Sequence, residues 1–163
     1  MHKLSNRALS KIVWQDPACF LAFGFGSGLM PYVPGTWGTL AAIPIYLLLS
    51  SCSLFIYLSA TFVAFILGIY VCNAASKKLG VHDFGGIVWD EIVGFLLTMV
   101  LAPPGWIWIL IGFLLFRLFD IWKPYPIGLM DKRIKGGFGI MLDDVLAAVY
   151  AWGILQTLVW CVK

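Results

Sequence analysis

The sequence predicts an all-α, polytopic membrane protein with about five hydrophobic helical segments. Hydrophobic residues make up 61% of its 163 residues and charged residues only 12%, about half the share of a soluble domain. No Asp, Glu, Lys or Arg occurs in residues 17–76, 92–116 or 145–162. Because a helix of about 20 apolar residues crosses a bilayer, lipid is expected to cover part of these stretches. The length fits one domain over residues 1–163.

The N-terminal part is expected to combine a polar tail with a broken membrane segment. Residues 1–16 contain three basic side chains and are interpreted as a cytoplasmic or interfacial tail, with an amphipathic helix as one form of it. The apolar residues 18–30 are interrupted by glycines. Residues 31–39 hold two prolines and two glycines, which argues against a regular helix. This Gly/Pro-rich stretch is therefore expected to be re-entrant-like.

The remaining chain is expected to form helices joined by uncharged turns and polar loops. The helices cover residues 40–49, 54–75, 87–102, 106–121 and 140–162. Residues 50–53 and 103–105 form the turns, and the polar loops lie around His82 and over residues 122–139. If both turns face outward, every Lys and Arg except Lys163 lies on the other side of the membrane. The positive-inside rule makes that side cytoplasmic.

Charge and cysteine content exclude several other classes of protein. The net charge of +3 is too small and too scattered to indicate a nucleic-acid partner. The four cysteines lie in or beside apolar segments and form no CxxC pair. They are interpreted as small buried hydrophobes, and neither disulfides nor zinc is expected.

Ionisable side chains gather at one end of each of three expected helices, and the expected topology puts these ends at one depth. They are Asp90, Glu91, Arg117, Asp120, Asp143 and Asp144. Oxygen ligands without a cluster of His or Cys suit Mg²⁺, which binds a few carboxylates together with phosphate oxygens of a substrate. The alternative is structural, because acids favour a helix N-terminus and Arg117 can pair with Asp120 one turn away.

A glycine-rich segment is the second feature with a possible chemical role. Gly35-Thr-Trp-Gly-Thr39 precedes an expected helix, so backbone N–H groups and the hydroxyls of Thr36 and Thr39 can face an anion. The alternative is a membrane loop in which glycine only permits tight turns.

Several phosphatase mechanisms are excluded by missing residues. No Cys is followed by Arg six positions later, no Asp-x-Asp exists for an aspartyl-phosphate mechanism, and there is no P-loop. His82 is the one histidine away from the N-terminus, which disfavours a two-histidine lipid phosphatase. Metal-assisted hydrolysis is the phosphatase mechanism that remains.

Four blocks follow one another along residues 24–150. They are Gly26-Ser-Gly28 with residues 34–40 (PGTWGTL), His82-Asp83 with residues 87–94 (IVWDEIVG), residues 116–127 (FRLFDIWKPYPI) and residues 136–144 (GGFGIMLDD). Together they resemble the phosphatidylglycerophosphatase A family, with no departure in the motif acids. The resemblance implies a Mg²⁺-dependent lipid phosphatase that converts phosphatidylglycerophosphate to phosphatidylglycerol. It also implies a multi-pass protein of the bacterial cytoplasmic (inner) membrane whose active site faces the cytoplasm.

In this interpretation each motif residue has an expected role. The metal ligands are Asp90, Glu91, Asp143 and Asp144, although adjacent helical residues point about 100° apart and not all are expected to bind directly. Catalytic roles are expected for Asp90, Glu91, Asp120, His82 and Asp83, with the last two as a general acid or base. The phosphate is expected to be bound by Thr36, Thr39, Arg117 and Lys123. A water activated by the metal is the preferred nucleophile. A carboxylate that attacks the phosphate directly is the alternative.

The main alternative function is a small membrane transporter or channel subunit with an acidic cation site. Transport needs polar groups near the membrane midplane, and inverted repeats favour it. Residues 54–72 contain no Asp, Glu, Lys, Arg or His, and no internal repeat is visible, so the sequence favours the enzyme. A purely structural membrane partner explains the apolar segments but not the acids at three helix ends.

Overall fold

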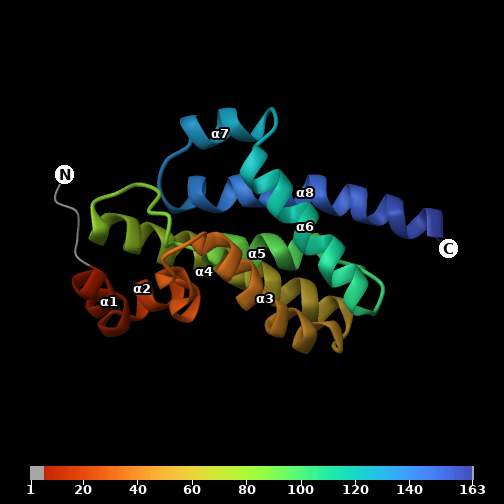
Figure 1. The fold of residues 1–163 in the computed structure, drawn as a ribbon, viewed down its shortest axis with the longest axis horizontal. Helices are drawn as coiled ribbons and strands as arrows, with labels where there is room; N and C mark the ends of the chain where they lie inside the picture. Colours follow the sequence, from red (N-terminus) through yellow and green to blue (C-terminus); the bar gives the residue numbers. More distant parts are fainter. Residues whose placement is uncertain (1–5, 163) are drawn as a thin grey trace.

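The protein is a bundle of helices (Figure 1). The structure, a computed structural model, describes residues 6–162 except for the side chains of Asn6, Asp131 and Lys132. Its elements are α1 (Asn6–Gln15), α2 (Pro17–Ala22), the 3₁₀ helix η1 (Gly24–Leu29), α3 (Pro34–Ser50), α4 (Leu54–Leu79), α5 (Trp89–Thr98), α6 (Trp106–Trp122), α7 (Ile127–Arg133) and α8 (Gly137–Val162). All regular elements of the described part are helical, which confirms the predicted all-α class.

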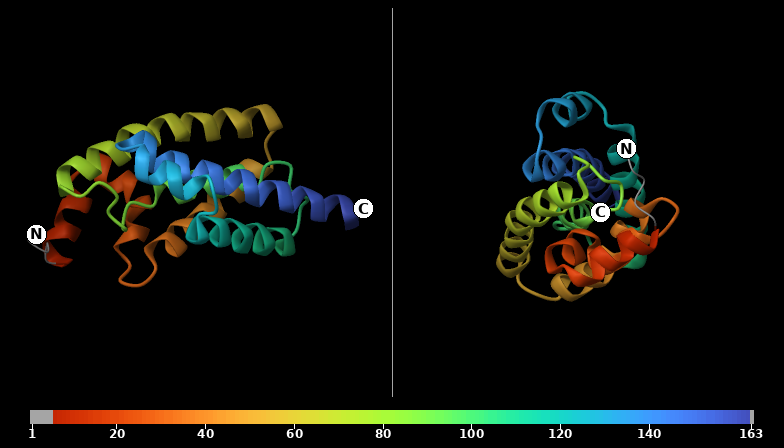
Figure 2. Two further views of the ribbon diagram at one scale, coloured as in Figure 1. Left: turned by 90° about the horizontal axis from the view of Figure 1, so that it is seen from above. Right: turned by 90° about the vertical axis from the view of Figure 1, so that its left-hand side faces the viewer.

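Two helices, α5 and α8, form the centre of the bundle. The short α5 packs against α3, α4, α6 and α8, and α8 also packs against α4, α6 and α7. Figure 1 shows α8 along the length of the molecule, and Figure 2 shows α4 and α6 running roughly the same way. Ala147, Ala148 and Ala151 are fully buried, so α8 meets its neighbours through small side chains. The chemistry-bearing residues of α5 are thereby placed next to α8.

Two helices are long and apolar enough to cross a membrane, α4 and α8. Each has 26 residues, and their most apolar windows have mean hydropathies of 2.3 and 1.8. Only 22% and 28% of these windows are buried within the molecule, so most of their apolar surface faces outward. This outward-facing apolar surface suggests association with a membrane. The expected number of about five spans is not confirmed, because α3 and α6 have 17 residues and α5 has 10.

The prediction that residues 31–39 cannot form a regular helix is wrong for their second half, because α3 begins at Pro34. A proline at the first helical position lacks only an N–H that would have no intrahelical partner, and its fixed φ suits the helix. The preceding Val33 takes the left-handed conformation with φ 48°, which turns the chain into α3. Gly35 therefore lies in a helical first turn and not in a loop.

The polar loop expected over residues 122–139 contains an additional helix, α7. Its seven residues give too short a periodic pattern for detection in the sequence. The helix after it, α8, begins at Gly137, three residues before the predicted start. The glycine at position 137 permits this start, because α8 passes so close to α4 here that any Cβ would collide with the Ile69 carbonyl.

The expected helix over residues 87–102 is shorter in the structure, because α5 ends at Thr98. The carbonyl of Val100, just beyond this end, accepts hydrogen bonds from two side chains of α8. The donors are Trp152 Nε1 at 3.0 Å and Gln156 Nε2 at 2.9 Å. Both lone pairs of this carbonyl thus have protein partners, which allows a helix to end inside a membrane protein.

The N-terminal segment is packed against the bundle from α1 onward, while residues 1–5 of the expected tail lie outside the described range. On α1, Val13 is fully buried and Trp14 is exposed, so the helix is amphipathic. Asp16 caps α2 by accepting a hydrogen bond from Cys19 N at 3.0 Å, and it forms an ion pair with Lys78 of α4. The Lys78 ammonium lowers the pKa of the Asp16 carboxyl from its ordinary value.

Candidate active site

Three acidic side chains from two helices converge at one end of the bundle. Asp90 and Glu91 lie in the first turn of α5, and Asp144 lies in the second turn of α8. One carboxylate oxygen from each lies within 4.8 Å of the others. Asp90 and Asp144 are 8% and 2% exposed, so water does not solvate them fully. This spacing is suited to a shared cation.

The acidic cluster, defined as Asp90, Glu91 and Asp144, contains buried oxygens without a protein partner. Asp90 Oδ1, Glu91 Oε2 and Asp144 Oδ2 accept no hydrogen bond from the described residues. Buried polar atoms are nearly always hydrogen-bonded, and a buried carboxylate without a counter-charge is strongly unfavourable. Carboxylate oxygens are the ligands that Mg²⁺ and Ca²⁺ prefer. The donor set therefore fits a hard divalent cation.

Arg117, in the last turns of α6, brings a positive charge to the edge of this cluster. Its Nη1 lies 2.5 Å from Asp120 Oδ2 and 3.7 Å from Glu91 Oε1. Asp120 also lies close enough to Asp144 for their charges to interact, so α6 adjoins the acids from both α5 and α8. The Arg117 side chain is only 12% exposed, which leaves it few positions to occupy. The guanidinium is thus held beside the acidic cluster.

The first turn of α3 closes over this cluster through Gly35. A Cβ on Gly35 would collide with Glu91 Oε1 and would lie 2.8 and 2.9 Å from the two terminal nitrogens of Arg117. Only glycine lets the backbone come this close. Thr36, the next residue, is half-buried, whereas Thr39 is fully buried and donates its hydroxyl to the Gly35 carbonyl at 2.9 Å. The Thr39 hydroxyl is therefore engaged within α3.

Gly94 permits the approach of α5 to both of its acid-bearing neighbours. A Cβ there would lie 2.5 and 2.6 Å from ring atoms of Phe116 of α6 and 3.3 Å from the Asp144 carbonyl of α8. Neither Gly35 nor Gly94 was predicted to act by close packing. For Gly94 the available signal was a glycine about one turn after the motif acids Asp90 and Glu91, whereas no acid lies near Gly35 in the sequence.

The two adjacent acids of α8 have different neighbours. Asp144 belongs to the acidic cluster, whereas Asp143 forms an ion pair with Lys123. Lys123 follows α6 directly and has a left-handed backbone with φ 44°. Residues next to each other on a helix point about 100° apart, which explains why the pair does not act as a unit. Of the four expected metal ligands, three are thus brought together.

His82 and Asp83 lie in the loop between α4 and α5, and both are exposed. The Nε2 atom of His82 accepts a hydrogen bond from Gly136 N at 2.7 Å. This bond joins the α4–α5 loop to the start of α8. His82 is therefore placed at the rim of the site and engaged by backbone, and neither residue belongs to the acidic cluster.

Comparisons with known proteins relate the chain to one family of phosphatases. The family model described as "Phosphatidylglycerophosphatase A" matches residues 20–159. A protein of that name from Haemophilus influenzae is 49% identical over 148 residues, which cover 90% of this chain and 91% of the relative. Its namesake from Escherichia coli K12 is 44% identical over 149 residues, covering 91% and 87%.

A further relative carries a different name. A "Putative phosphatidylinositol-3-phosphatase" from Bacteroides thetaiotaomicron is 39% identical over 147 residues, covering 85% of this chain and 91% of the relative. No solved structure matches the chain. The family model spans most of the chain and includes every residue of the acidic cluster. The chain therefore belongs to the phosphatidylglycerophosphatase A family.

Proposed function

We propose that this protein is a Mg²⁺-dependent lipid phosphatase that hydrolyses phosphatidylglycerophosphate to phosphatidylglycerol and phosphate. Membership of the family makes it a phosphatase that acts on a phosphate monoester. The observation that carries the metal requirement is the acidic cluster, whose three carboxylates are brought together with buried oxygens that have no protein partner. The transporter alternative receives no support from the relatives.

In this proposal Asp90, Glu91 and Asp144 hold the Mg²⁺ ion. A Mg²⁺ ion held by so few carboxylates would also bind water and phosphate oxygens of the substrate, as in phosphoryl-transfer enzymes. When bound, the ion supplies positive charge that polarises the phosphoryl group and activates a water molecule for attack. The close packing of Gly35 on Glu91 keeps that carboxylate directed toward the other two.

Two basic side chains are proposed to bind the phosphate. Arg117 presents a planar guanidinium beside Glu91, and such a group fits two phosphate oxygens at once. Asp120 orients it through the 2.5 Å contact. Lys123 is held near the site by its ion pair with Asp143. We therefore assign Asp143 the positioning of Lys123, in place of the metal-ligand role expected from sequence, and we assign Thr36 a supporting backbone and hydroxyl contact.

Proton transfer is assigned to Asp120, which contacts Arg117 and lies close to Asp144. A general acid or base must lie within hydrogen-bonding reach of the reacting group, and Asp120 adjoins the cluster where the phosphate would bind. His82 and Asp83 are assigned to the loop at the rim of the site, where His82 ties two segments together.

The substrate is proposed to enter from the cytoplasmic face of the bacterial inner membrane. The acidic cluster lies near the starts of α5 and α8, on the same side as Lys77 and Lys78 at the end of α4. A lipid headgroup can reach this depth while its acyl chains stay in the bilayer. The positive-inside rule then directs this end of a multi-pass protein toward the cytoplasm.

Phosphate release from a panel of lipids tests the proposed reaction. The purified protein is expected to release phosphate from phosphatidylglycerophosphate with Mg²⁺ and to stop when EDTA removes the ion. The panel includes phosphatidylinositol-3-phosphate, because one relative is named for that substrate. Faster release from phosphatidylinositol-3-phosphate would contradict the proposed substrate, and release that EDTA does not affect would contradict the metal.

Labelling of cysteines in intact cells tests the orientation. Contrary to the expectation that all four cysteines are buried, Cys52 and Cys161 are exposed. The native Cys52, at the turn between α3 and α4, is expected to react with an impermeant maleimide from outside. In a background with Cys52 and Cys161 replaced by Ser, the variant Lys77→Cys is expected to react only after permeabilisation. Labelling of both positions from the same side would contradict the proposed topology.

A further inference from the structure

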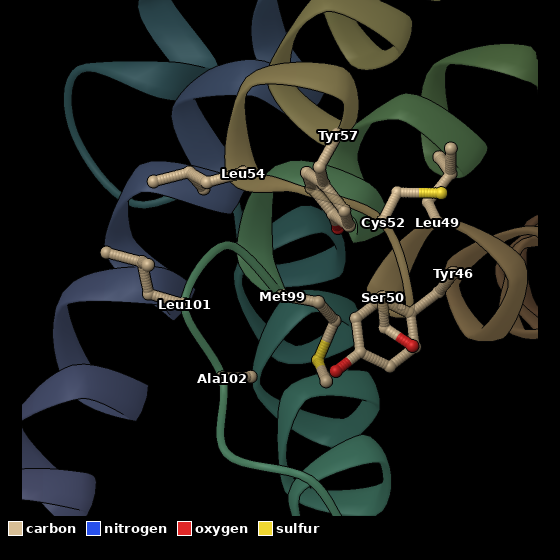
Figure 3. A pocket seen from close by; sticks show the side chains of 9 residues that line it. All are labelled: Tyr46, Leu49, Ser50, Cys52, Leu54, Tyr57, Met99, Leu101 and Ala102. Carbon is tan, nitrogen blue, oxygen red and sulfur yellow. The ribbon is translucent and has the colours of Figure 1, made fainter.

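A cavity of about 180 Å³ lies at the end of the bundle away from the acidic cluster (Figure 3). It is bounded by the end of α3, the start of α4 and the segment that follows α5. The acidic cluster instead adjoins the first turns of α3 and α5, so the cavity and the active site lie at opposite ends of these helices. Its lining is Tyr46, Leu49, Ser50, Cys52, Leu54, Tyr57, Met99, Leu101 and Ala102.

The cavity wall carries one hydrogen-bond donor that has no partner among the described residues and is accessible from the cavity. Tyr46 is 5% exposed, and its hydroxyl makes no hydrogen bond with any described residue. Tyr57, equally buried, donates its hydroxyl to the Leu96 carbonyl at 2.6 Å. The Tyr57 hydroxyl is thus engaged inside the fold, whereas the Tyr46 hydroxyl is free to donate to a molecule in the cavity.

The direction of the Tyr46 hydroxyl is fixed by aromatic packing. Its ring meets Tyr57 edge to face with centroids 6.3 Å apart and meets Phe95 in the same way at 6.1 Å. Figure 3 shows the tip of Tyr46 extending from α3 toward Met99. The hydroxyl is therefore held at the cavity wall, ready to donate to a molecule inside.

The rest of the lining indicates what that molecule is. No lining residue carries a charge, so a charged headgroup would find no counter-charge there. A cavity of about 150 Å³ holds a molecule such as benzene, so this one has room for about six carbon atoms. Leu54 and Leu101 are both well exposed beside it, which gives the cavity an apolar mouth. The occupant is thus an apolar chain with a hydrogen-bond acceptor.

The position of the cavity along the membrane identifies the acceptor. Leu54 begins one of the two candidate spans, so the cavity lies where the hydrocarbon region ends. The ester carbonyls that join acyl chains to glycerol occupy this depth in a bilayer, at the border with the interfacial region. We propose that the cavity binds the first part of an acyl chain of a membrane phospholipid, whose ester carbonyl accepts the Tyr46 hydrogen bond.

Ester- and ether-linked lipids separate this hydrogen bond from general apolar binding. Purified protein is titrated with dioleoyl phosphatidylcholine or its dialkyl ether analogue, and bound lipid is counted by native mass spectrometry. Phosphatidylcholine has no phosphate monoester and is not a substrate of the proposed reaction. The ester lipid is expected to bind about three- to tenfold more tightly, the effect of one net hydrogen bond. Tyr46→Phe, which keeps the ring, should remove this difference.

Matched variants make the outcome specific to the cavity. Tyr57→Phe loses an internal hydrogen bond and should lower the melting temperature while keeping the ester preference. Asp90→Asn should also keep the preference, so the result does not depend on the proposed catalytic function. Equal affinities of the wild-type protein for both lipids would overturn the proposal, since the hydroxyl then faces only water. An ester preference that survives Tyr46→Phe would overturn it as well.

Discussion

Asp90→Asn and Asp144→Asn are each expected to lower the rate of phosphate release by more than about a hundredfold, while the protein stays folded. Even second-shell partners of metal ligands typically change affinity or activity by about 10- to 100-fold, and these two residues are proposed as ligands themselves. Asparagine keeps the size of the side chain and one oxygen but removes the charge that a hard cation requires. The initial rate of phosphate release at saturating Mg²⁺ measures the effect.

Thermal unfolding with and without Mg²⁺ shows whether the variants lose activity because they no longer bind the metal. Ligand at about 100 times its Kd stabilises the native state by about 2.7 kcal/mol. The wild-type protein is expected to gain stability of this order, and both Asn variants should lose most of the gain. Without Mg²⁺ they should be at least as stable as the wild type, because neighbouring buried acids repel one another.

Two other acids serve as controls for this experiment. Asp143→Asn should keep the Mg²⁺ shift, because Asp143 forms an ion pair with Lys123 and is not one of the three acids of the cluster. Asp16→Asn should keep both activity and the shift, because that carboxyl belongs to the α2 cap and the Lys78 ion pair. Full activity of Asp90→Asn and Asp144→Asn would remove both residues from the site.

Gly35→Ala is expected to reduce activity strongly although alanine is the better helix former. The added Cβ would collide with Glu91 Oε1 and lie within 2.9 Å of the Arg117 guanidinium, so the first turn of α3 must move or the two side chains must separate. Either shift spoils the arrangement proposed for metal and phosphate binding. Misplacement of about 1 Å can cost a hundredfold in rate. Steady-state kinetics and the Mg²⁺-dependent melting shift both report it.

Gly153→Ala is the matched control for this substitution. Gly153 lies inside α8, and a Cβ there would have no neighbour within 4 Å. Replacing a helical glycine by alanine at such a site stabilises a protein by about 0.5–1 kcal/mol. Gly153→Ala should therefore keep full activity with a slightly higher melting temperature. Equal and full activity of both variants would show that α3 does not need to approach Glu91 this closely.

The sequence predicted the long apolar helices well because their signal is local. The uncharged residues 54–75 and 145–162 lie within α4 and α8, and hydropathy alone identifies such segments. The start of α3 was missed because the same prolines and glycines that break a helix interior also begin a helix. The helical content of residues 127–133 was missed because seven residues show too little periodicity.

The candidate site was predictable as a set of residues but not as an arrangement. Motif spacing singled out Asp90, Glu91, Asp143 and Asp144, yet the separation of Asp143 from Asp144 depends on where Lys123 lies. That position depends on the end of α6, which sequence periodicity cannot locate to one residue. Gly35 was noticed as part of a loop, whereas its contact with Glu91 and Arg117 is a tertiary feature.

The two hydrogen bonds on the Val100 carbonyl fix the position of α5 along α8. Asp144 meets the acid-bearing first turn of α5, and Trp152 and Gln156 meet its far end. Trp152 lies eight positions after Asp144, so the two contact points lie about 12 Å apart along the helix axis. One inserted residue would rotate the donors by about 100° away from Val100. Related sequences should therefore vary in composition between these positions but not in length.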